Sequence, residues 1–259
     1  MGAVETKAND GRRPGDTLRA AGVSRSFQGV RAVADVDLEI HDHEVVGLIG
    51  PNGAGKSTLV NLLTGFDRAD EGSVELSGRD VTRWSPDRRG RAGLTRTFQH
   101  SHAFRGLSVR ENVEVAALGT GASPRDAHDR ADGLLVGLGL ERYADAPAAN
   151  LPHGHERRLG VARALATSPR FVLMDEPAAG LPEAEVTAFA EVVRSVRDEF
   201  GAGVLLIDHN MALVMDVCDR IYVLDQGRML AGGPPDEIRA NLDVAAAYLG
   251  DSAVREDAP

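Results

Sequence analysis

A short apolar run followed by a glycine-rich loop constrains this sequence more than any other feature. Residues Val45–Ile49 are VVGLI, an apolar run that is rich in β-branched side chains and typical of a strand buried on both faces of a parallel sheet. The next residues, GPNGAGKST, fit the pattern G-x-x-x-x-G-K-[ST], and a helix-like segment that begins near Lys56 follows and ends at Gly65. A buried strand, a glycine-rich turn and a helix in this order predict a phosphate-binding loop rather than a turn beside a surface lysine.

Phosphate binding explains why these residue types occur at this spacing. Glycines let backbone N–H groups converge on phosphate oxygens, and the N-terminus of the following helix adds its positive end. We expect Lys56 to reach the β- and γ-phosphates of a nucleotide and the Ser57 hydroxyl to bind Mg²⁺. The sequence has only one other lysine, Lys7, so its remaining 27 basic residues are arginines. The other expected nucleotide-binding residues of the loop are Asn52, Gly53, Ala54, Gly55 and Thr58.

A second apolar strand pattern is followed by two carboxylates that can take part in phosphate chemistry. In FVLMDEP, four apolar residues precede Asp175, which we expect on the Mg²⁺ side of the phosphates, and Glu176, which is placed to polarise a water for attack on the γ-phosphate. Gln99 ends the strand-like LTRTFQ and His209 ends VLLIDH. Their order relative to the two phosphate motifs marks both as functional rather than surface residues.

The pattern of segments predicts an α/β fold. Strand patterns before residue 100 include two N-terminal runs that we expect to pair antiparallel, and strand patterns return in FVLMDEP, VLLIDH and RIYVLDQGRML. Residues from about 100 to 165 are helix-like instead and predict an inserted α-helical subdomain. The apolar spacing over 183–200 predicts a helix that packs on the core. We therefore expect a P-loop NTPase (RecA-like) core with a mostly parallel sheet in one domain over 17–250, a disordered leader over 1–16 and a tail over 251–259.

Composition excludes several other classes. With 39 acidic and 29 basic residues the net charge is −10, which argues against a protein that coats nucleic acid. The single cysteine, Cys218, excludes an intramolecular disulfide and a cysteine-cluster metal site. The longest run without Asp, Glu, Lys or Arg is eleven residues, and the N-terminus lacks the apolar core of a signal peptide. We therefore expect a cytoplasmic chain without a membrane span.

Taken in order, these motifs resemble the ATP-binding subunit of an ABC transporter over about residues 18–248. The order is GPNGAGKST, Gln99, LPHGH before ERRLGVARAL, FVLMDEP and His209. The segments SRSFQGVRAV, LTRTFQHSHAF, EPAAGL and AAAYLG are similar to the branched-chain amino acid uptake type. The resemblance implies that Phe27 stacks on adenine, Gln99 senses Mg²⁺ and the attacking water, Glu176 is the catalytic base and His209 senses the γ-phosphate.

The resemblance also implies partners. Two such subunits sandwich two ATP molecules, and each site joins one chain's phosphate motifs to the other chain's signature loop, here Leu151 to His155 with Gly154. Two membrane permease subunits and an extracytoplasmic solute-binding protein complete an importer, which places this chain on the inner face of the plasma membrane, with no nucleic acid partner. The alternatives are a soluble ABC ATPase that does not serve transport and the ATPase of a lipid-linked exporter. A P-loop kinase or GTPase would lack the helical insertion that ends in a signature-like loop.

Two departures from the family pattern concern loops that serve the partner's site. The usual Leu-Ser-x-Gly-Gln is LPHGH here, so that Pro152 offers neither hydroxyl nor N–H and His155 replaces an amide. Pro182 stands where the family has Asp or Asn. One hypothesis is that the chain pairs with a different ATPase whose signature is complete; the alternative is that the family tolerates these changes. The sequence does not identify the solute.

Seven arginines between residues 83 and 110 accompany a single acid, Asp87. Such a run is typical of a solvated face, and it also fits proximity to anionic lipid headgroups or to the membrane partner.

Overall fold

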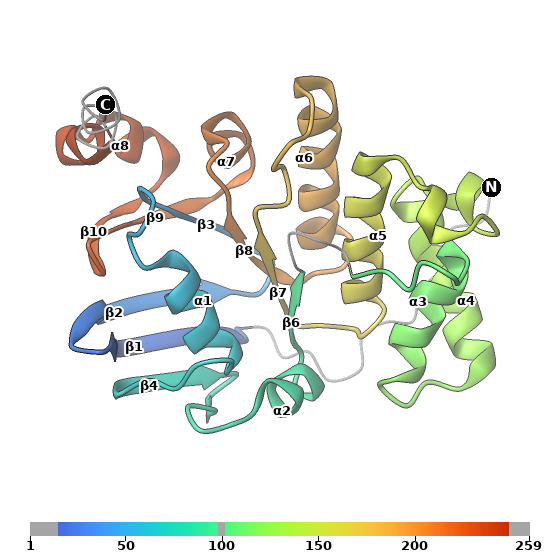
Figure 1. Ribbon diagram of the computed structural model, residues 1–259, viewed down its shortest axis with the longest axis horizontal. Coiled ribbons are helices and arrows are strands. Elements are labelled where there is room, and N and C mark those ends of the chain that lie inside the picture. The colour runs from blue at the N-terminus through green and yellow to red at the C-terminus, as the bar shows by residue number, and fades with distance from the viewer. Residues whose placement is uncertain (1–14, 98–101, 249–259) are drawn as a thin grey trace.

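The computed structural model describes residues 15–97 and 102–248, and the strands of these residues form two sheets (Figure 1). The larger sheet has the order β10-β9-β3-β8-β7-β6. All neighbouring pairs in it are parallel except β9 and β10, so the predicted mostly parallel sheet is confirmed. Its strands are β3 (Val45–Ile49), β6 (Leu94–Thr97), β7 (Phe171–Asp175), β8 (Gly203–Ile207), β9 (Arg220–Asp225) and β10 (Arg228–Gly233).

The smaller sheet is antiparallel and has the order β2-β1-β4-β5. Its strands are β1 (Thr17–Phe27), β2 (Val30–His41), β4 (Glu71–Leu76) and β5 (Arg79–Asp80). The predicted antiparallel pairing of the N-terminal strands is therefore confirmed.

The helices cover both faces of the larger sheet, and α3, α4 and α5 gather at one end of the molecule (Figure 1). These three lie in the region where the helical subdomain is predicted. Sequence patterns do not reveal α2, α7 or α8, which are short, and the helix expected over 183–200 ends at residue 198. The helices are α1 (Lys56–Thr64), α2 (Pro86–Arg91), α3 (Val109–Leu118), α4 (Pro124–Gly137), α5 (His153–Leu165), α6 (Glu183–Asp198), α7 (Met211–Val217) and α8 (Pro235–Ala240), with 3₁₀ turns at Glu141–Tyr143 and Ala148–Asn150.

The larger sheet is buried on both faces because its side chains alternate between two cores. In β3, Val45 and Ile49 pack with the helices α3 to α7, whereas Val46 and Leu48 pack with α1 and the antiparallel sheet. Every residue of β3 is buried. This burial explains why the strand is apolar without alternation, as a two-sided core demands.

The segment RIYVLDQGRML forms two strands instead of one. Gln226 and Gly227 both have positive φ, 45° and 77°, and turn the chain between β9 and β10. Two consecutive left-handed residues match the twist of a tight hairpin. The turn lies against the phosphate loop, because the Gly227 N–H donates to the Ala54 carbonyl at 2.9 Å.

Among the described residues, no helix is long and apolar enough to cross a membrane. The predicted leader over 1–16, except for its last two residues, and the predicted tail over 251–259 lie outside the described part of the chain. Asp16 is buried and pairs with Arg170 at 2.7 Å, which joins the start of the described chain to the start of β7.

Candidate functional site

The phosphate loop connects β3 to α1, and two of its glycines stand at positions where no side chain would fit. A Cβ at Gly50 would lie 2.0 Å from the Leu224 carbonyl oxygen, and one at Gly55 would lie 2.3 Å from that of Ala32. Gly55 precedes α1 with φ 103°, a left-handed conformation that L side chains rarely adopt. One side of the loop is therefore packed tightly against neighbouring backbone, and a ligand would approach from the opposite side.

Lys56 folds back across this loop. Its Nζ donates to the carbonyls of Gly50 at 2.6 Å and Pro51 at 2.9 Å, which positions the positive charge over the turn. Asn52, Gly53 and Ser57 are exposed, whereas Ala54 is buried in the core. Within the described chain, no side chain caps the N-terminus of α1, and its first turn holds no acidic residue. The first-turn N–H groups and Lys56 together make an anion-binding site.

Asp175 lies at the carboxyl end of β7, on the same edge of the sheet as the phosphate loop. The two strands β3 and β7 flank β8 and run parallel to it, so their carboxyl ends share that edge. The Arg96 guanidinium connects the two motifs, because it pairs with Asp175 Oδ2 at 2.6 Å and donates to Asn61 Oδ1 of α1 at 2.8 Å. Sequence patterns do not point to Arg96, which stood only as one of seven arginines.

Glu176 follows in a strained conformation. Its φ is 47°, and its N–H donates to the Ile207 carbonyl at the end of β8 at 2.7 Å. A non-glycine residue held in the left-handed region by its surroundings is a frequent mark of a functional position. The carboxylate is half-buried, directly beside Asp175 in the chain.

His209 and its neighbour Asp208 follow β8 at the same edge. The His209 side chain is 70% exposed, whereas that of Asp208 is fully buried. Asp208 accepts hydrogen bonds from the N–H groups of Ala178 at 2.9 Å and Asn210 at 2.8 Å. It therefore ties the loop after β7 to the residues around His209. An acid directly after an apolar strand is the only sequence signal for Asp208.

Phe27 ends β1, and its ring is 41% exposed with the Arg25 guanidinium 4.7 Å from its centroid. The hairpin that Phe27 begins returns through Ala32, whose carbonyl packs on Gly55 of the phosphate loop. The hairpin thus connects this exposed ring to the phosphate loop, and the stacking of Phe27 on adenine stays a prediction.

The signature-like loop lies elsewhere. Leu151 and Pro152 precede α5, which stands beyond β6 and β7 from α1 in Figure 1, so the chain does not bring this loop to its own phosphate loop. A Cβ at Gly154 would lie 2.3 Å from Oε2 of Glu185, which places that carboxylate against the loop. The His155 ring packs edge-on against Tyr143 at 4.8 Å. Burial and two nearby arginines lower the pKa of His155, so the side chain is neutral at physiological pH.

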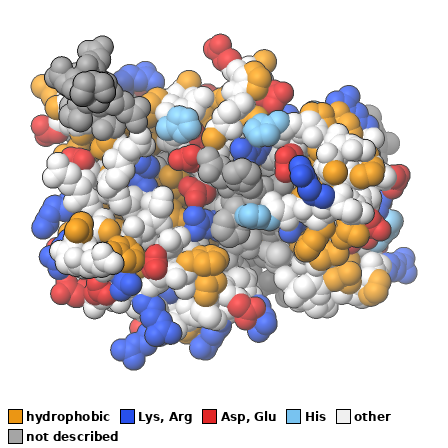
Figure 2. Space-filling view, viewed as in Figure 1, with side chains coloured by type: hydrophobic (Ala, Val, Ile, Leu, Met, Phe, Trp, Pro, Cys, Tyr) orange, Lys and Arg blue, Asp and Glu red, His pale blue; other side chains and the backbone are white. Residues whose placement is uncertain are grey.

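Gln99 lies outside the described residues, and its predicted role stays a prediction. Figure 2 shows Lys and Arg side chains gathered at the edge formed by α2. The arginine run is not one solvated face, however: Arg88 is exposed, Arg89 is 1% exposed and Arg96 is engaged with Asp175.

A magnesium ion suits the donors present. The Ser57 hydroxyl and the Asp175 carboxylate are hard oxygen donors, the kind that Mg²⁺ takes alongside substrate phosphates. Within the described ranges no group of three or more His, Cys, Asp and Glu side chains is arranged to hold a metal. Such an ion would thus rely on a bound nucleotide for further ligands.

Comparison with known proteins is consistent across sequence and structure. The family described as "ABC transporter" matches residues 33–179, and "Branched-chain amino acid ATP-binding cassette transporter" matches 228–254. The chain is 42% identical to the high-affinity branched-chain amino acid transport ATP-binding protein LivG of Salmonella typhimurium, over 91% of this chain and 98% of that protein. It is 38% identical to the corresponding BraF protein of Pseudomonas aeruginosa, again over 91% and 98%.

Among solved structures, the ADP conformation of MJ1267, an ATP-binding cassette of an ABC transporter, superposes with a TM-score of 0.82. It is 28% identical and covers 91% of this chain and 99% of its own. A nucleotide-free cassette from an ABC transporter gives a TM-score of 0.81 at 28% identity, covering 90% of this chain and 98% of its own.

Proposed function

The chain is an ATP-binding subunit of the ABC transporter family, with the ATPase fold of that family, and from this premise we propose that it powers a branched-chain amino acid importer. The observation that supports the site assignment is that Lys56 and the start of α1 lie at the same edge of the larger sheet as Asp175 and Glu176. The family match over 228–254 favours the branched-chain type over a lipid-linked exporter or an ATPase that does not serve transport.

In this proposal the residues of the shared edge divide the work on ATP. The loop amides and Lys56 bind the phosphates, and the exposed Phe27 ring takes the adenine. Glu176 polarises the attacking water, and His209 contacts the γ-phosphate. Ser57, Asp175 and Gln99 would hold Mg²⁺, which supplies charge neutralisation between the β- and γ-phosphates.

The buried charges of the site support that division. The Arg96 guanidinium binds Oδ2 of Asp175 and fixes this carboxylate, so in the proposal its other oxygen binds the Mg²⁺ ion. Asp208 accepts a hydrogen bond from the loop that contains Glu176, and it directly precedes His209 in the chain, so it connects the two segments. The base and the sensor are therefore kept in a set relation while His209 stays exposed.

A second ATPase subunit of different sequence is the proposed partner in the sandwich. Pro152 precedes α5, no side chain of the described residues caps the start of that helix, and the Glu185 carboxylate lies against Gly154. A carboxylate at this position opposes the approach of a partner's γ-phosphate to the start of α5. Together with Pro182, this supports one strong and one weakened hydrolysis site in a heterodimer.

Two membrane permeases and an extracytoplasmic binding protein complete the proposed importer, with this chain on the inner face of the plasma membrane. Closure of the ATPase pair on ATP and reopening after hydrolysis would drive the permeases. The ATPase never touches the solute, so the choice of branched-chain amino acids is supported by the relatives rather than by the site.

Co-expression with the permeases and the second ATPase tests this function. With the binding protein and leucine on one side of the vesicle membrane and ATP on the side of the ATPases, the assembled complex should transport leucine, and Glu176→Gln should abolish transport and hydrolysis. Glu191→Gln, at an exposed position of α6, is the matched control and should leave both unchanged. Uptake that survives Glu176→Gln, or a complex that never forms with permeases, contradicts the proposal.

The heterodimer has its own test. The chain alone should hydrolyse ATP slowly, and addition of the second ATPase should raise the rate. Fast hydrolysis by the chain alone, abolished by Glu176→Gln, would refute the asymmetry without touching the transport function.

A further inference from the structure

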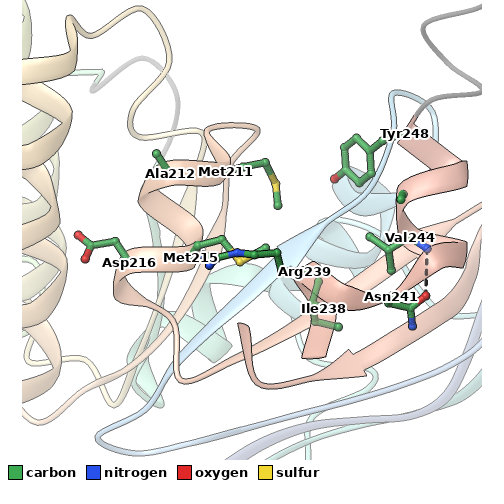
Figure 3. Close-up of a pocket in the computed structure, with 10 residues that line it drawn as sticks. Met211, Ala212, Met215, Asp216, Ile238, Arg239, Asn241, Val244 and Tyr248 are labelled. Atoms are coloured by element: carbon green, nitrogen blue, oxygen red, sulfur yellow. Dashed lines mark hydrogen bonds between the residues drawn. The ribbon is translucent and has the colours of Figure 1, made fainter. Parts of the chain in front are cut away.

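The motifs of the phosphate site give no role to two groups of described residues. One group lines a cavity of about 660 Å³ beside α7 (Figure 3). Its lining is chiefly apolar and includes Met211, Met215, Ile238 and Val244. Such a lining offers few partners to the phosphates of a nucleotide. The second group, at the end of β1, consists of charged and aromatic side chains instead.

Asp70, which directly precedes β4, holds this second group together. Its Oδ1 accepts a hydrogen bond from Nη1 of Arg25 at 2.7 Å, and its Oδ2 accepts one from the N–H of Ser26 at 2.8 Å. The Asp70 N–H donates to the Ser24 carbonyl at 2.8 Å. The hydrogen bonds from Ser26 and Arg25 lower the pKa of Asp70, so its carboxylate is ionised at neutral pH. Asp70 therefore fixes three consecutive residues of β1 directly before Phe27.

The same contacts place the Arg25 guanidinium over the Phe27 ring, 4.7 Å from its centroid. Residues two apart in a strand point to the same side of a sheet, which brings these two side chains together. The Arg25 side chain is 26% exposed, and Phe27 remains 41% exposed. One face of the ring is thus occupied by a fixed cation, and the exposed part of the ring is left for another planar group.

A bulge in the hairpin sets the position of this ring relative to the phosphate loop. The step from Arg25 to Ser26 on β1 spans two residues of β2, so Ala32 is an extra residue in that strand. The Ala32 carbonyl oxygen lies so close to Gly55 that a Cβ there would come within 2.3 Å of it. The part of β1 that Asp70 holds therefore lies opposite the part of β2 that touches the loop.

We propose that Arg25 and Asp70 are positioning residues for the adenine of ATP: Asp70 holds the Arg25 guanidinium on one face of Phe27, and the ring presents its other face to the base. The inference rests on the proposed stacking of adenine on Phe27. A ring that is already immobilised loses less rotamer freedom when the base stacks on it, so ATP binds more tightly. Neither side chain acts on the phosphates or on the attacking water, so kcat is left unchanged.

Arg25→Gln removes the cation and keeps a polar side chain. We expect ATP to bind about fivefold more weakly, which corresponds to the freedom lost when one side chain is immobilised. Inorganic tripolyphosphate has no base and should bind as tightly as it binds to the wild type. The KM for ATP should rise by about the same factor as the loss in affinity, while kcat and Tm stay close to those of the wild type. A contact that only supports the fold predicts equal losses for both ligands.

Arg31→Gln is the matched control. Arg31 lies on β2 of the same hairpin and pairs with Glu71, the residue after Asp70, at 3.1 Å. This substitution removes the same charge from the same hairpin, so a general loss of attraction for polyanions would appear in both variants. We expect the ATP affinity of Arg31→Gln to equal that of the wild type.

Two further variants test how Asp70 acts. Asp70→Asn should weaken ATP binding toward the level of Arg25→Gln, but it should add nothing in the Arg25→Gln background, because the guanidinium that Asp70 holds is then absent. Arg25→Lys keeps a cation near the ring and should recover part of the affinity that Arg25→Gln loses. An additional loss from Asp70→Asn in the Arg25→Gln background would overturn the part assigned to Asp70.

Two results would overturn the inference as a whole. One is an Arg25→Gln variant that binds ATP like the wild type although Phe27→Leu binds ATP more weakly. The other is an equal loss of ATP and tripolyphosphate affinity in Arg25→Gln. Failure of the proposed adenine site looks different, because Phe27→Leu itself would then bind ATP as tightly as the wild type does.

Discussion

Arg89 holds the far end of the helix that presents the phosphate loop. Its side chain is 1% exposed, and Nη1 donates to the carbonyls of Leu62 at 2.6 Å and Leu63 at 2.5 Å, while Nη2 donates to that of Thr82 at 3.0 Å. The first two carbonyls belong to the last turn of α1, where helix carbonyls lack partners within the helix and partial negative charge accumulates. We predict that Arg89→Met destabilises the whole fold.

The magnitude follows from two opposing effects. Three hydrogen bonds from a charged donor are together worth about 6 kcal/mol. Burial of the guanidinium lowers its pKa from 12.5 to about 10, which corresponds to a desolvation cost of about 3 kcal/mol that methionine avoids. Methionine fills much of the same volume but leaves the three carbonyls without donors. The expected loss in free energy of unfolding is therefore about 3 kcal/mol, in line with broken buried charge contacts elsewhere.

Urea denaturation and thermal scans of the purified chain measure this loss. For a chain of this size we expect Tm to fall by about 6–12 °C. The neighbouring Arg88 supplies the control, because its guanidinium stacks 3.8 Å from the Trp84 ring centroid at an exposed position. Arg88→Met should cost less than about 1 kcal/mol. An Arg89→Met variant as stable as Arg88→Met would refute this account of α1.

Two further predictions concern other buried charges. Asp208→Asn should lower kcat about tenfold with ATP affinity nearly unchanged, because one of two backbone N–H groups loses its acceptor and His209 shifts. Asp216→Asn, at a half-exposed site, is the control. An unaltered kcat in Asp208→Asn would contradict the role of Asp208 in positioning His209. Burial raises the pKa of Glu44, but hydrogen bonds from Arg220 and a backbone N–H outweigh it and hold the pKa below 4.5. The stabilisation by ionised Glu44 is thus complete above about pH 4.5 and is lost as pH falls through the folded pKa. Urea titrations in acid should therefore show the wild type losing stability more steeply than Glu44→Gln. Parallel pH profiles of the two proteins would contradict this prediction.

The central part of the site could be predicted because it is local in the chain. The strand, the glycines and Lys56 are consecutive, and Asp175 directly follows its own apolar strand, so hydropathy and residue type suffice to identify them. The order of the motifs then allowed the family and its ATPase fold to be recognised. Gln99 fits the same order, but its place is outside the described residues.

What could not be predicted depends on contacts between distant segments. Arg96 meets Asp175 only after β6 and β7 pair, and Arg89 is buried only because the end of α1 lies beside it. The arginine run therefore looked uniform in the sequence although its members differ completely in environment. Gln226 and the following glycine are a turn signal, but they lie within a segment that is otherwise typical of a strand, so the sequence pattern did not separate β9 from β10.

The position of β3 in its sheet also bears on how the chain is made. Both neighbours of β3, β8 and β9, come from the last quarter of the chain, at Gly203–Ile207 and Arg220–Asp225. A nascent chain that has emerged only as far as α6 holds the complete phosphate motif but has neither strand to pair with β3. The phosphate loop therefore gains its support late in synthesis, and until then β3 presents two unpaired apolar edges of the kind that chaperones bind.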